Sequence, residues 1–232
     1  MSEAYRAGGE TADAGVRAFV QQVYGWMAAA LAVTGFVALA VSRSATMQQL
    51  IFGSRFVFFG LIVGELLLVV WLAARIGRMS AQTATTVFVG YSVLNGLTMS
   101  AIFLVYAQAT IATAFFVTSG LFAVMTLYGF FTKTDLTRMG NILAMALVGF
   151  VIASLVNLFL RSEGLYWLIT YAGVLIFTGL VGYDSQRIKE MALAGVGDGE
   201  EGRKYAIMGA LRLYLDFVNL FLLLLRIFGR RR

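Results

Sequence analysis

Apolar residues along this chain gather in long runs that are separated by short polar connections. Each run has about 20 residues or slightly more, which is enough for a helix to cross a hydrocarbon core of roughly 30 Å. The ten-residue alternating pattern of a membrane β-barrel does not occur in the sequence. The pattern therefore predicts an all-α integral membrane protein with seven transmembrane helices. The predicted spans are 19–41, 56–76, 84–106, 109–131, 140–160, 165–186 and 206–228.

Polar segments flank the spans and divide the chain. Residues 1–18 mix small, acidic and basic side chains and lack the basic-then-apolar order of a cleavable signal peptide, so we expect a disordered cytoplasmic tail. Residues 19–228 then form one seven-helix transmembrane domain, and 229–232 form a basic C-terminal tail. The longest connection, 187–205, gathers Gly, Asp and Glu and is predicted to be a mobile cytoplasmic loop.

The lysines and arginines between the spans predict the orientation of the chain. With a cytoplasmic N-terminus, ten of them lie inside and three outside, which fits the excess of positive charge on cytoplasmic segments. The C-terminal arginines at 230–232 do not fit, because a complete seventh span would place them outside. The sequence leaves the side of the C-terminus open. The inner residues are Arg6, Arg17, Arg75, Arg78, Lys133, Arg138, Arg187, Lys189, Arg203 and Lys204, and the outer ones are Arg43, Arg55 and Arg161.

Composition narrows the possible chemistry. The chain is 60% hydrophobic and 13% charged, whereas soluble domains have about 25% charged residues. It contains neither Cys nor His, which excludes disulfides, thiol catalysis, Cys/His zinc sites and histidine-activated nucleophiles. Proton chemistry near neutral pH must therefore use carboxylates. The net charge of +6 is scattered at span ends, so we expect the lipid bilayer, and no nucleic acid, as a partner.

Three acids stand out because they lie inside apolar runs. Of the twelve acidic residues, only Glu65, Asp184 and Asp216 have this position. A charge at the middle of a bilayer costs about 2.5–3.5 kcal/mol on insertion scales. Such acids are expected to face protein or water, and each is a candidate functional residue.

Two of these acids are predicted to share a depth near the cytoplasmic edge. Asp184 precedes Arg187 by three residues, and Asp216 follows Arg212 by four, so each acid lies about one helical turn from a basic residue at that edge. The second span also ends inside, at Arg75. The sequence therefore predicts that Asp184 can meet Asp216 and Arg75.

Simpler interpretations of the same residues stay open. Asp184 could pair only with Arg187, and Asp216 only with Arg212, as local helix pairs that contribute a few tenths of a kcal/mol. The spacing of Arg212, Asp216 and Asn219 puts them on one helix face, which suits a buried helix that lines an aqueous path.

Glu65 is predicted to lie near the middle of the membrane. It follows Gly60 and Gly64, whose spacing is typical of a helix-packing contact. Glu65 could line a pore as a cation site, or it could be a protonated acid that is hydrogen-bonded inside the protein. The sequence does not choose between these two roles.

Two classes of enzyme or receptor fit poorly. A retinal protein needs a lysine inside a span, but Lys133, Lys189 and Lys204 all lie in connections. An intramembrane aspartyl protease has a Tyr-Asp pair, as in Tyr183 and Asp184, but its second acid follows Gly-x-Gly and it carries a Pro-Ala-Leu motif. Asp216 instead lies in "LYLDF", and the chain has no proline. We therefore expect that the protein is not an enzyme.

Four stretches carry a resemblance to a known family: "QQVYGWMAAALAVTG", "GLTMSAIFLVY", "GYDSQRIK" and "GALRLYLDFVNLFLLLLRIFG". In them the chain resembles the transmembrane Bax inhibitor motif family, also called Bax inhibitor-1-like, in its bacterial branch. The resemblance implies six helices around a central seventh, and a pair of aspartates that senses pH and gates a calcium leak. By motif match the pair is Asp184 and Asp216. The arginine of the second helix that acts as a latch corresponds to Arg75.

The resemblance implies a multi-pass protein of the cell inner membrane that conducts calcium or other cations in response to pH. Calcium and protons are its expected ligands, and no cofactor is expected. Members of the family have also been linked to regulation of membrane proteolysis. The alternative function is therefore a regulatory protein that binds a membrane protease or another partner and conducts no ions.

Physical chemistry fits the implied role of the aspartates. Two close carboxylates in a poorly solvated site cannot both ionise easily, so they are expected to share a proton. Calcium takes six to eight oxygen ligands, and two carboxylates offer at most four. We therefore expect Asp184 and Asp216 to bind calcium weakly, with water and backbone carbonyls completing the site.

Overall fold

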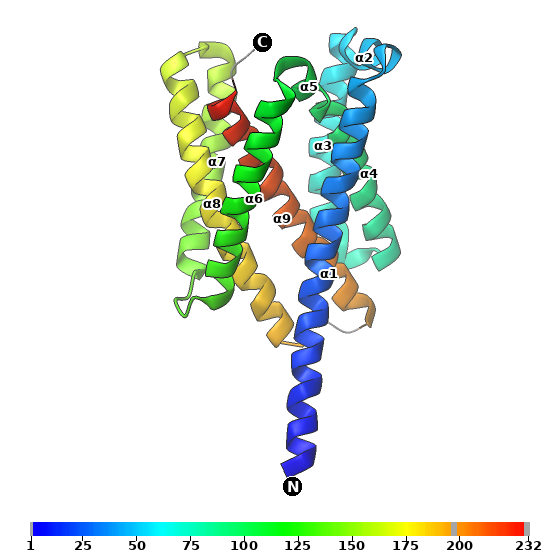
Figure 1. Ribbon diagram of the computed structural model, residues 1–232, viewed down its shortest axis with the longest axis vertical. Coiled ribbons are helices and arrows are strands. Elements are labelled where there is room, and N and C mark those ends of the chain that lie inside the picture. Colours follow the sequence, from blue (N-terminus) through cyan, green and yellow to red (C-terminus); the bar gives the residue numbers. More distant parts are fainter. Residues whose placement is uncertain (1, 196–198, 230–232) are drawn as a thin grey trace. The chain divides into compact units, whose positions relative to one another are not determined.

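The computed structural model describes residues 2–195 and 199–229, all of whose regular elements are helical. Seven of these helices are long and apolar enough to cross a membrane, which confirms the predicted fold class. Two short helices and one 3-10 turn lie between them (Figure 1). The elements are α1 (Ser2–Ser42), α2 (Ala45–Phe52), α3 (Arg55–Arg75), η1 (Ile76–Arg78), α4 (Ala81–Met99), α5 (Ala101–Val105), α6 (Gln108–Phe131), α7 (Thr137–Leu160), α8 (Glu163–Leu193) and α9 (Gly199–Phe228).

The first helix extends beyond its predicted span. α1 begins at Ser2, so it includes residues for which the sequence predicts a disordered tail. Ala, Glu and Arg in this segment are good helix formers, and a helix propagates easily from the apolar run that follows.

The connection between the last two helices is much shorter than the predicted loop at 187–205. α8 continues to Leu193 and α9 begins at Gly199, so the loop prediction is wrong over these helical parts. Ile188 and Ala192 are 1% and 4% exposed, so buried apolar side chains continue on α8 into the predicted loop despite its polar composition. Residues 196–198 lie outside the described residues, as do the arginines at 230–232 of the predicted basic tail.

The chain divides into two compact units. Unit 1 contains Met1–Tyr106 and Lys189–Tyr214, and unit 2 contains Ala107–Ile188 and Leu215–Arg232. α9 therefore contributes its first half to unit 1 and its second half to unit 2. It is the most buried of the seven spans. In its apolar 18-residue stretch 72% of the residues are buried, whereas the corresponding share is 6% in α3 and 0% in α7. The seventh helix is thus surrounded by protein, whereas α3 and α7 present most of their side chains to the outside.

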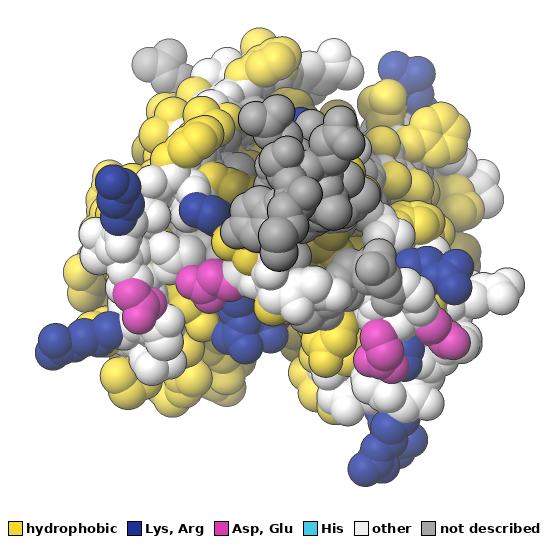
Figure 2. Space-filling model, turned by 90° about the horizontal axis from the view of Figure 1, so that it is seen from below, with side chains coloured by type: hydrophobic (Ala, Val, Ile, Leu, Met, Phe, Trp, Pro, Cys, Tyr) yellow, Lys and Arg dark blue, Asp and Glu magenta, His cyan; other side chains and the backbone are white. Residues whose placement is uncertain are grey.

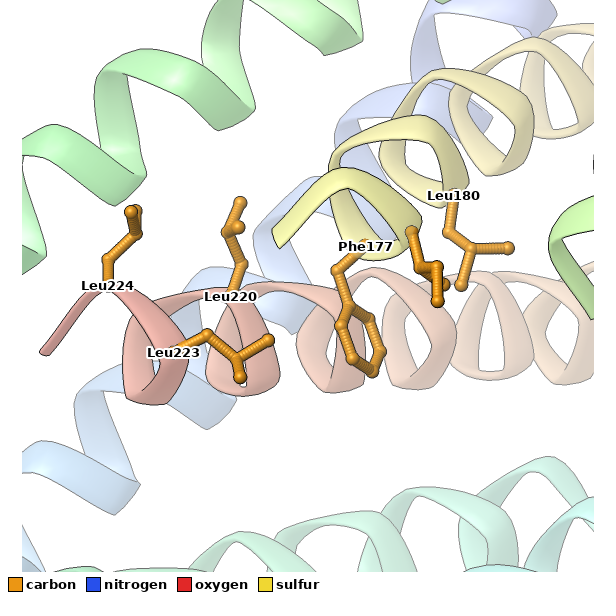
Figure 3. Packing of buried hydrophobic residues seen from close by; sticks show 6 residues of the cluster. Phe177, Leu180, Leu220, Leu223 and Leu224 are labelled. Atoms are coloured by element: carbon orange, nitrogen blue, oxygen red, sulfur yellow. The ribbon is translucent and has the colours of Figure 1, made fainter. Parts of the chain in front are cut away.

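In unit 2, α8 and α9 run antiparallel with an apolar core between them. Phe177 and Leu180 of α8 pack with Leu220, Leu223 and Leu224 of α9 (Figure 3). Near the beginning of α8, the Arg226 guanidinium lies 5.6 Å from the centre of the Tyr166 ring. Within unit 2, residues late in α8 therefore lie beside residues early in this part of α9. The end of α9 lies beside the beginning of α8.

Glycines let α8 approach α6 and α7 closely. A Cβ atom added to Gly129 of α6 would fall on the carbonyl oxygen of Gly182 in α8. A Cβ atom added to Gly140 of α7 would lie 2.5 Å from the ring of Tyr183. Small residues of this kind allow helices to pack tightly in a membrane, where no hydrophobic effect drives them together.

Exposed charges are spread over the protein. Figure 2 shows Lys and Arg side chains separated by Asp, Glu and hydrophobic side chains on the face seen from below. Among the described residues of that face, basic side chains form no continuous stripe. The expectation that no nucleic acid binds stays a prediction.

The close contact at Gly129 generates a stability prediction. Gly129→Ala should lower the free energy of unfolding by about 1–3 kcal/mol, because the methyl group forces α6 and α8 apart. Thermal unfolding in detergent would measure this loss. Gly120→Ala is the matched control on the same helix, because a Cβ atom there meets nothing within 4 Å. We expect the control to be neutral or slightly stabilising, and equal midpoints for the two variants would contradict the prediction.

Candidate functional site

The two aspartates predicted as a pair both lie in unit 2 and are buried. Asp184 is 8% exposed and Asp216 is 5% exposed. Asp184 lies one turn after Leu180 on α8, and Asp216 lies one turn before Leu220 on α9. Because Leu180 and Leu220 belong to one core cluster and the helices are antiparallel, the acids lie at the same level on adjacent helices. Their role as a pH sensor stays a prediction.

The neighbours of these acids bear on the alternative of local ion pairs. The Arg187 guanidinium donates a hydrogen bond to the Tyr183 hydroxyl at 2.9 Å, one turn back along α8. Arg187 therefore has a hydrogen-bonding neighbour other than Asp184. Arg212 is exposed on α9, and a local pair between Arg212 and Asp216 stays open.

Arg75 is the last residue of α3 and is exposed. It belongs to unit 1, whereas Asp184 and Asp216 belong to unit 2. The contact between this arginine and the acids therefore stays a prediction. Its place at the end of a helix is favourable for a cation, because the helix dipole is negative there.

Asn219 uses its amide within its own helix. Its Nδ2 atom donates to the Leu215 carbonyl oxygen at 2.8 Å, and the side chain is half-buried. Arg212, which the sequence places on the same face, lies in unit 1, whereas Asn219 lies in unit 2. The pore-lining role of these two residues stays a prediction.

Glu65 takes part in a polar cluster of unit 1. Its Oε1 atom accepts a hydrogen bond of 2.8 Å from the Thr98 hydroxyl, which also lies 3.0 Å from the Asn95 carbonyl oxygen. The single hydroxyl proton of Thr98 can serve only one acceptor at a time. An ionised Glu65 would receive that proton, whereas a protonated Glu65 could donate to Thr98 and leave Thr98 to donate to Asn95. The geometry accommodates both charge states of the acid.

The same cluster extends to α1 and α9 through Tyr214, which is fully buried. Its hydroxyl donates to Asn95 Oδ1 at 3.1 Å and lies 2.7 Å from the Thr34 hydroxyl. Thr34 also lies 2.9 Å from the Ser92 carbonyl oxygen, to which it can donate. Sequence reasoning missed these residues. The available signal was Asn95, an amide inside an apolar run, since such polar groups are expected to bond between helices.

Metal binding can be considered only for the described residues. Among them, no three acidic side chains group closely enough to hold a metal ion. Any calcium at Asp184 and Asp216 would therefore need most of its oxygen ligands from water or from the backbone.

These observations define a multi-pass helical membrane protein with buried polar clusters inside its spans. Residues 16–232 match the family described as inhibitor of apoptosis-promoting Bax1, and the chain belongs to this family. It is 51% identical to the inner membrane protein YbhL of Escherichia coli strain K12. The similarity extends over 220 residues, which are 94% of each chain.

More distant relatives cover the protein almost as fully. A protein of Borreliella burgdorferi is 44% identical over 92% of each chain. A membrane protein of Streptococcus pyogenes serotype M1 is 36% identical over 94% of this chain and 95% of its own. With seven spanning helices, the similarity to an inner membrane protein supports a multi-pass protein of the inner membrane.

The hydrogen bonds of Tyr214 generate a prediction for unit 1. Tyr214→Phe should destabilise the protein by about 0.5–1.5 kcal/mol, because the Asn95 and Thr34 side chains lose a buried partner. Tyr91→Phe is the control: its ring packs edge-on against Tyr214, and its hydroxyl has no hydrogen bond in the described part of the chain. Denaturation in detergent micelles would compare the variants. A Tyr91 variant as unstable as the Tyr214 variant would contradict the prediction.

Proposed function

We propose that the protein is a pH-sensitive leak for calcium or other cations, gated by Asp184 and Asp216. The observation that carries this proposal is the position of two buried acids at the same level on antiparallel helices. Buried charges are costly unless they are paired, so two acids in one such layer support a role other than packing.

The pair can respond to pH without histidine. Two neighbouring carboxylates with little water resist carrying two negative charges, so one proton is shared between them over part of the pH range. Losing or gaining that proton changes the charge of the site by one unit. In a medium of low dielectric constant such a change alters the balance between closed and open arrangements.

Arg75 is the proposed latch. While the pair is negatively charged, a charge-assisted hydrogen bond from Arg75 holds the site closed. Adding a proton removes the anion, and an arrangement in which water solvates the arginine becomes more favourable. Acid therefore increases the leak. A tenfold change in the ratio of open to closed protein corresponds to about 1.4 kcal/mol, which suits a graded response.

The proposed cargo is calcium, which also binds weakly at Asp184 and Asp216. The protein needs no cofactor and acts without catalysing a reaction. Glu65 is a second proposed contact for cations along the path, because its carboxylate is half-buried and keeps hydrogen-bonding partners in either charge state.

The alternative function is a membrane regulator that binds a protease or another partner and conducts no ions. Purified protein in liposomes distinguishes the two functions, because a leak needs no partner and a regulator gives no flux.

The proposed orientation places the N-terminus in the cytoplasm. The end of α9 lies beside the beginning of α8, so a cytoplasmic end of α8 implies a C-terminus on the opposite side of the membrane. The proposal therefore puts the C-terminal end of α9 on the periplasmic side.

The gating proposal predicts the pH dependence of calcium flux. Wild-type protein in liposomes should leak about tenfold more at pH 6 than at pH 8, since a shared carboxylate proton can be gained or lost in this range. Asp184→Asn and Asp216→Asn should flatten the pH dependence, and Arg75→Ala should increase the leak at high pH. Exposed Arg78 at the end of η1 provides the control variant Arg78→Ala.

Two results would contradict this proposal. If both asparagine variants keep the wild-type pH profile, the pair is not the sensor, and Glu65→Gln becomes the variant to measure. If wild-type protein shows no flux at any pH, the protein does not conduct by itself and the regulatory alternative is favoured.

The orientation can be tested by labelling single cysteines, because the chain has none of its own. Ala45→Cys at the beginning of α2 should react with an impermeant maleimide added from the periplasmic side. Ala194→Cys after α8 should react only once the cytoplasmic side is accessible. Both residues are exposed. Labelling with the opposite sidedness would reverse the topology and move the acids to the other edge of the membrane.

A further inference from the structure

Gln186 is a buried amide whose two polar atoms both bind the connection between α6 and α7. Its Oε1 atom accepts a hydrogen bond from the Leu136 backbone N–H at 2.8 Å, and its Nε2 atom donates to the Thr134 carbonyl oxygen at 2.9 Å. The side chain is 8% exposed. A flipped amide would place its NH2 group against the Leu136 N–H and its oxygen against the Thr134 carbonyl oxygen. The two bonds therefore fix one orientation of the amide.

The connection has its own short-range order. Leu136 is buried, and its carbonyl oxygen accepts the first helical hydrogen bond of α7, from Gly140 N–H at 2.8 Å. The Asp135 carboxylate accepts from Thr137 N–H at 2.8 Å. Gln186 adds to this arrangement because its amide binds two more backbone groups of the connection, the N–H of buried Leu136 and the carbonyl oxygen of Thr134.

The residues beside Asp184 hold α8 to the rest of unit 2. Gly182 meets Gly129 of α6, and the Tyr183 ring covers Gly140 of α7. The Ser185 hydroxyl donates to Thr126 of α6 at 3.4 Å, a long bond. Asp184 lies one helical turn after Leu180, which packs in the same cluster as Leu220 of α9, so the helical spacing puts Asp184 on the side of α8 that faces α9.

Helix geometry links the orientation of Gln186 to that of Asp184. Successive residues are about 100° apart, so residues two apart point about 200° from each other, to nearly opposite sides of the helix. A rotation of α8 that carries Asp184 away from α9 would pull Gln186 out of its contacts with Thr134 and Leu136.

We propose that Gln186 is a positioning residue that ties the α6–α7 connection to Asp184 and fixes the acid in its place facing α9. This inference rests on the proposed function, in which Asp184 and Asp216 act as a pair. The two hydrogen bonds of the buried amide hold this turn of α8 in one rotation about its axis.

Other ionisable groups near the connection also affect the local charge, so their contribution must be distinguished from that of Asp184 and Asp216. Hydrogen bonds from the side chain and the backbone of Thr137 hold the pKa of Asp135 below its usual range. Asp135 therefore stays ionised where the buried pair is expected to titrate. Within about two turns of the two acids along α8 and α9, and in or beside the connection, the acids are Asp135, Asp184, Glu190 and Asp216, and the cations are Lys133, Arg138, Arg187, Lys189 and Arg212.

The test combines two measurements on full-length protein in detergent. Gln186→Met keeps the length of the side chain but removes both hydrogen bonds. Exchange of the Leu136 amide hydrogen should become at least about tenfold faster, since the amide loses its acceptor. Infrared titration of the protonated carboxyl band, assigned by its loss in Asp184→Asn, should show a midpoint shifted by about half a pH unit or more, roughly threefold in proton affinity.

Further variants separate positioning from a general loss of stability. Gln186→Glu retains an acceptor for Leu136 N–H, so exchange of that amide should stay near the wild-type rate. Leu136→Ala disturbs the connection without changing α8 and should shift the carboxyl midpoint in the same direction as Gln186→Met. Gln82→Met, at an exposed site on α4, is the control that should change neither measurement.

Each outcome decides the inference. Unchanged exchange at Leu136 in Gln186→Met would show that the bond from Leu136 N–H to Gln186 is absent in solution, which overturns the inference. Faster exchange with an unchanged carboxyl midpoint would reduce Gln186 to a structural role. Absence of a titrating carboxyl band in wild-type protein would overturn both the pair and its positioning. A titrating band without calcium flux would overturn conduction alone, so failure of the proposed function is distinguishable from failure of this inference.

Discussion

The absence of water from the hydrocarbon core is the constraint on which this structure depends, because each polar group there must find its partner inside the protein. Backbone groups find theirs within helices. Several hydroxyls do the same: Thr118 donates to the Ala114 carbonyl oxygen at 2.7 Å, and Ser154 donates to Phe150 at 2.7 Å. A smaller set bonds between elements, including Tyr214 with Asn95 and Gln186 with Thr134. These bridging groups, rather than apolar residues common to every span, distinguish the buried polar clusters of the two units.

Packing follows from the same constraint, since lipid tails compete with apolar side chains for every helix face. Close contact must then come from shape. Gly129 admits the backbone of α8, and Gly140 admits the ring of Tyr183. In unit 1, a Cβ atom on Gly96 of α4 would lie 2.7 Å from the side chain of Val37 in α1. The glycines that face open space, such as Gly60 and Gly64, have no such contact. The spacing of glycines alone therefore does not identify a packing surface.

The sequence predicts the number and class of helices well, because a span of about 20 apolar residues has few alternatives in a membrane. It predicts the helix ends poorly. Buried Ile188 and Ala192 extend α8 into a segment whose Gly, Asp and Glu content indicates a loop. The acids of the candidate site are visible from sequence because a carboxylate in an apolar run is costly. Gln186 is not, since it is the last residue of the predicted span 165–186, where a polar side chain is expected to meet solvent, and its partners are backbone groups 50 and 52 residues away.

The unequal burial of the helices indicates which parts of the protein can respond when the charge of the acids changes. α9 is held on most of its surface, and α8 is fixed by glycine contacts and by Gln186, so separating these two helices would disrupt many contacts at once. In α3 only 6% of the residues in the apolar 18-residue stretch are buried, and the helix ends at Arg75. Elements with few buried contacts lie at the low end of local stability. Under the proposed gating, the acids would be the sensor that stays in place, and Arg75 at the end of a loosely packed helix would be the latch that moves.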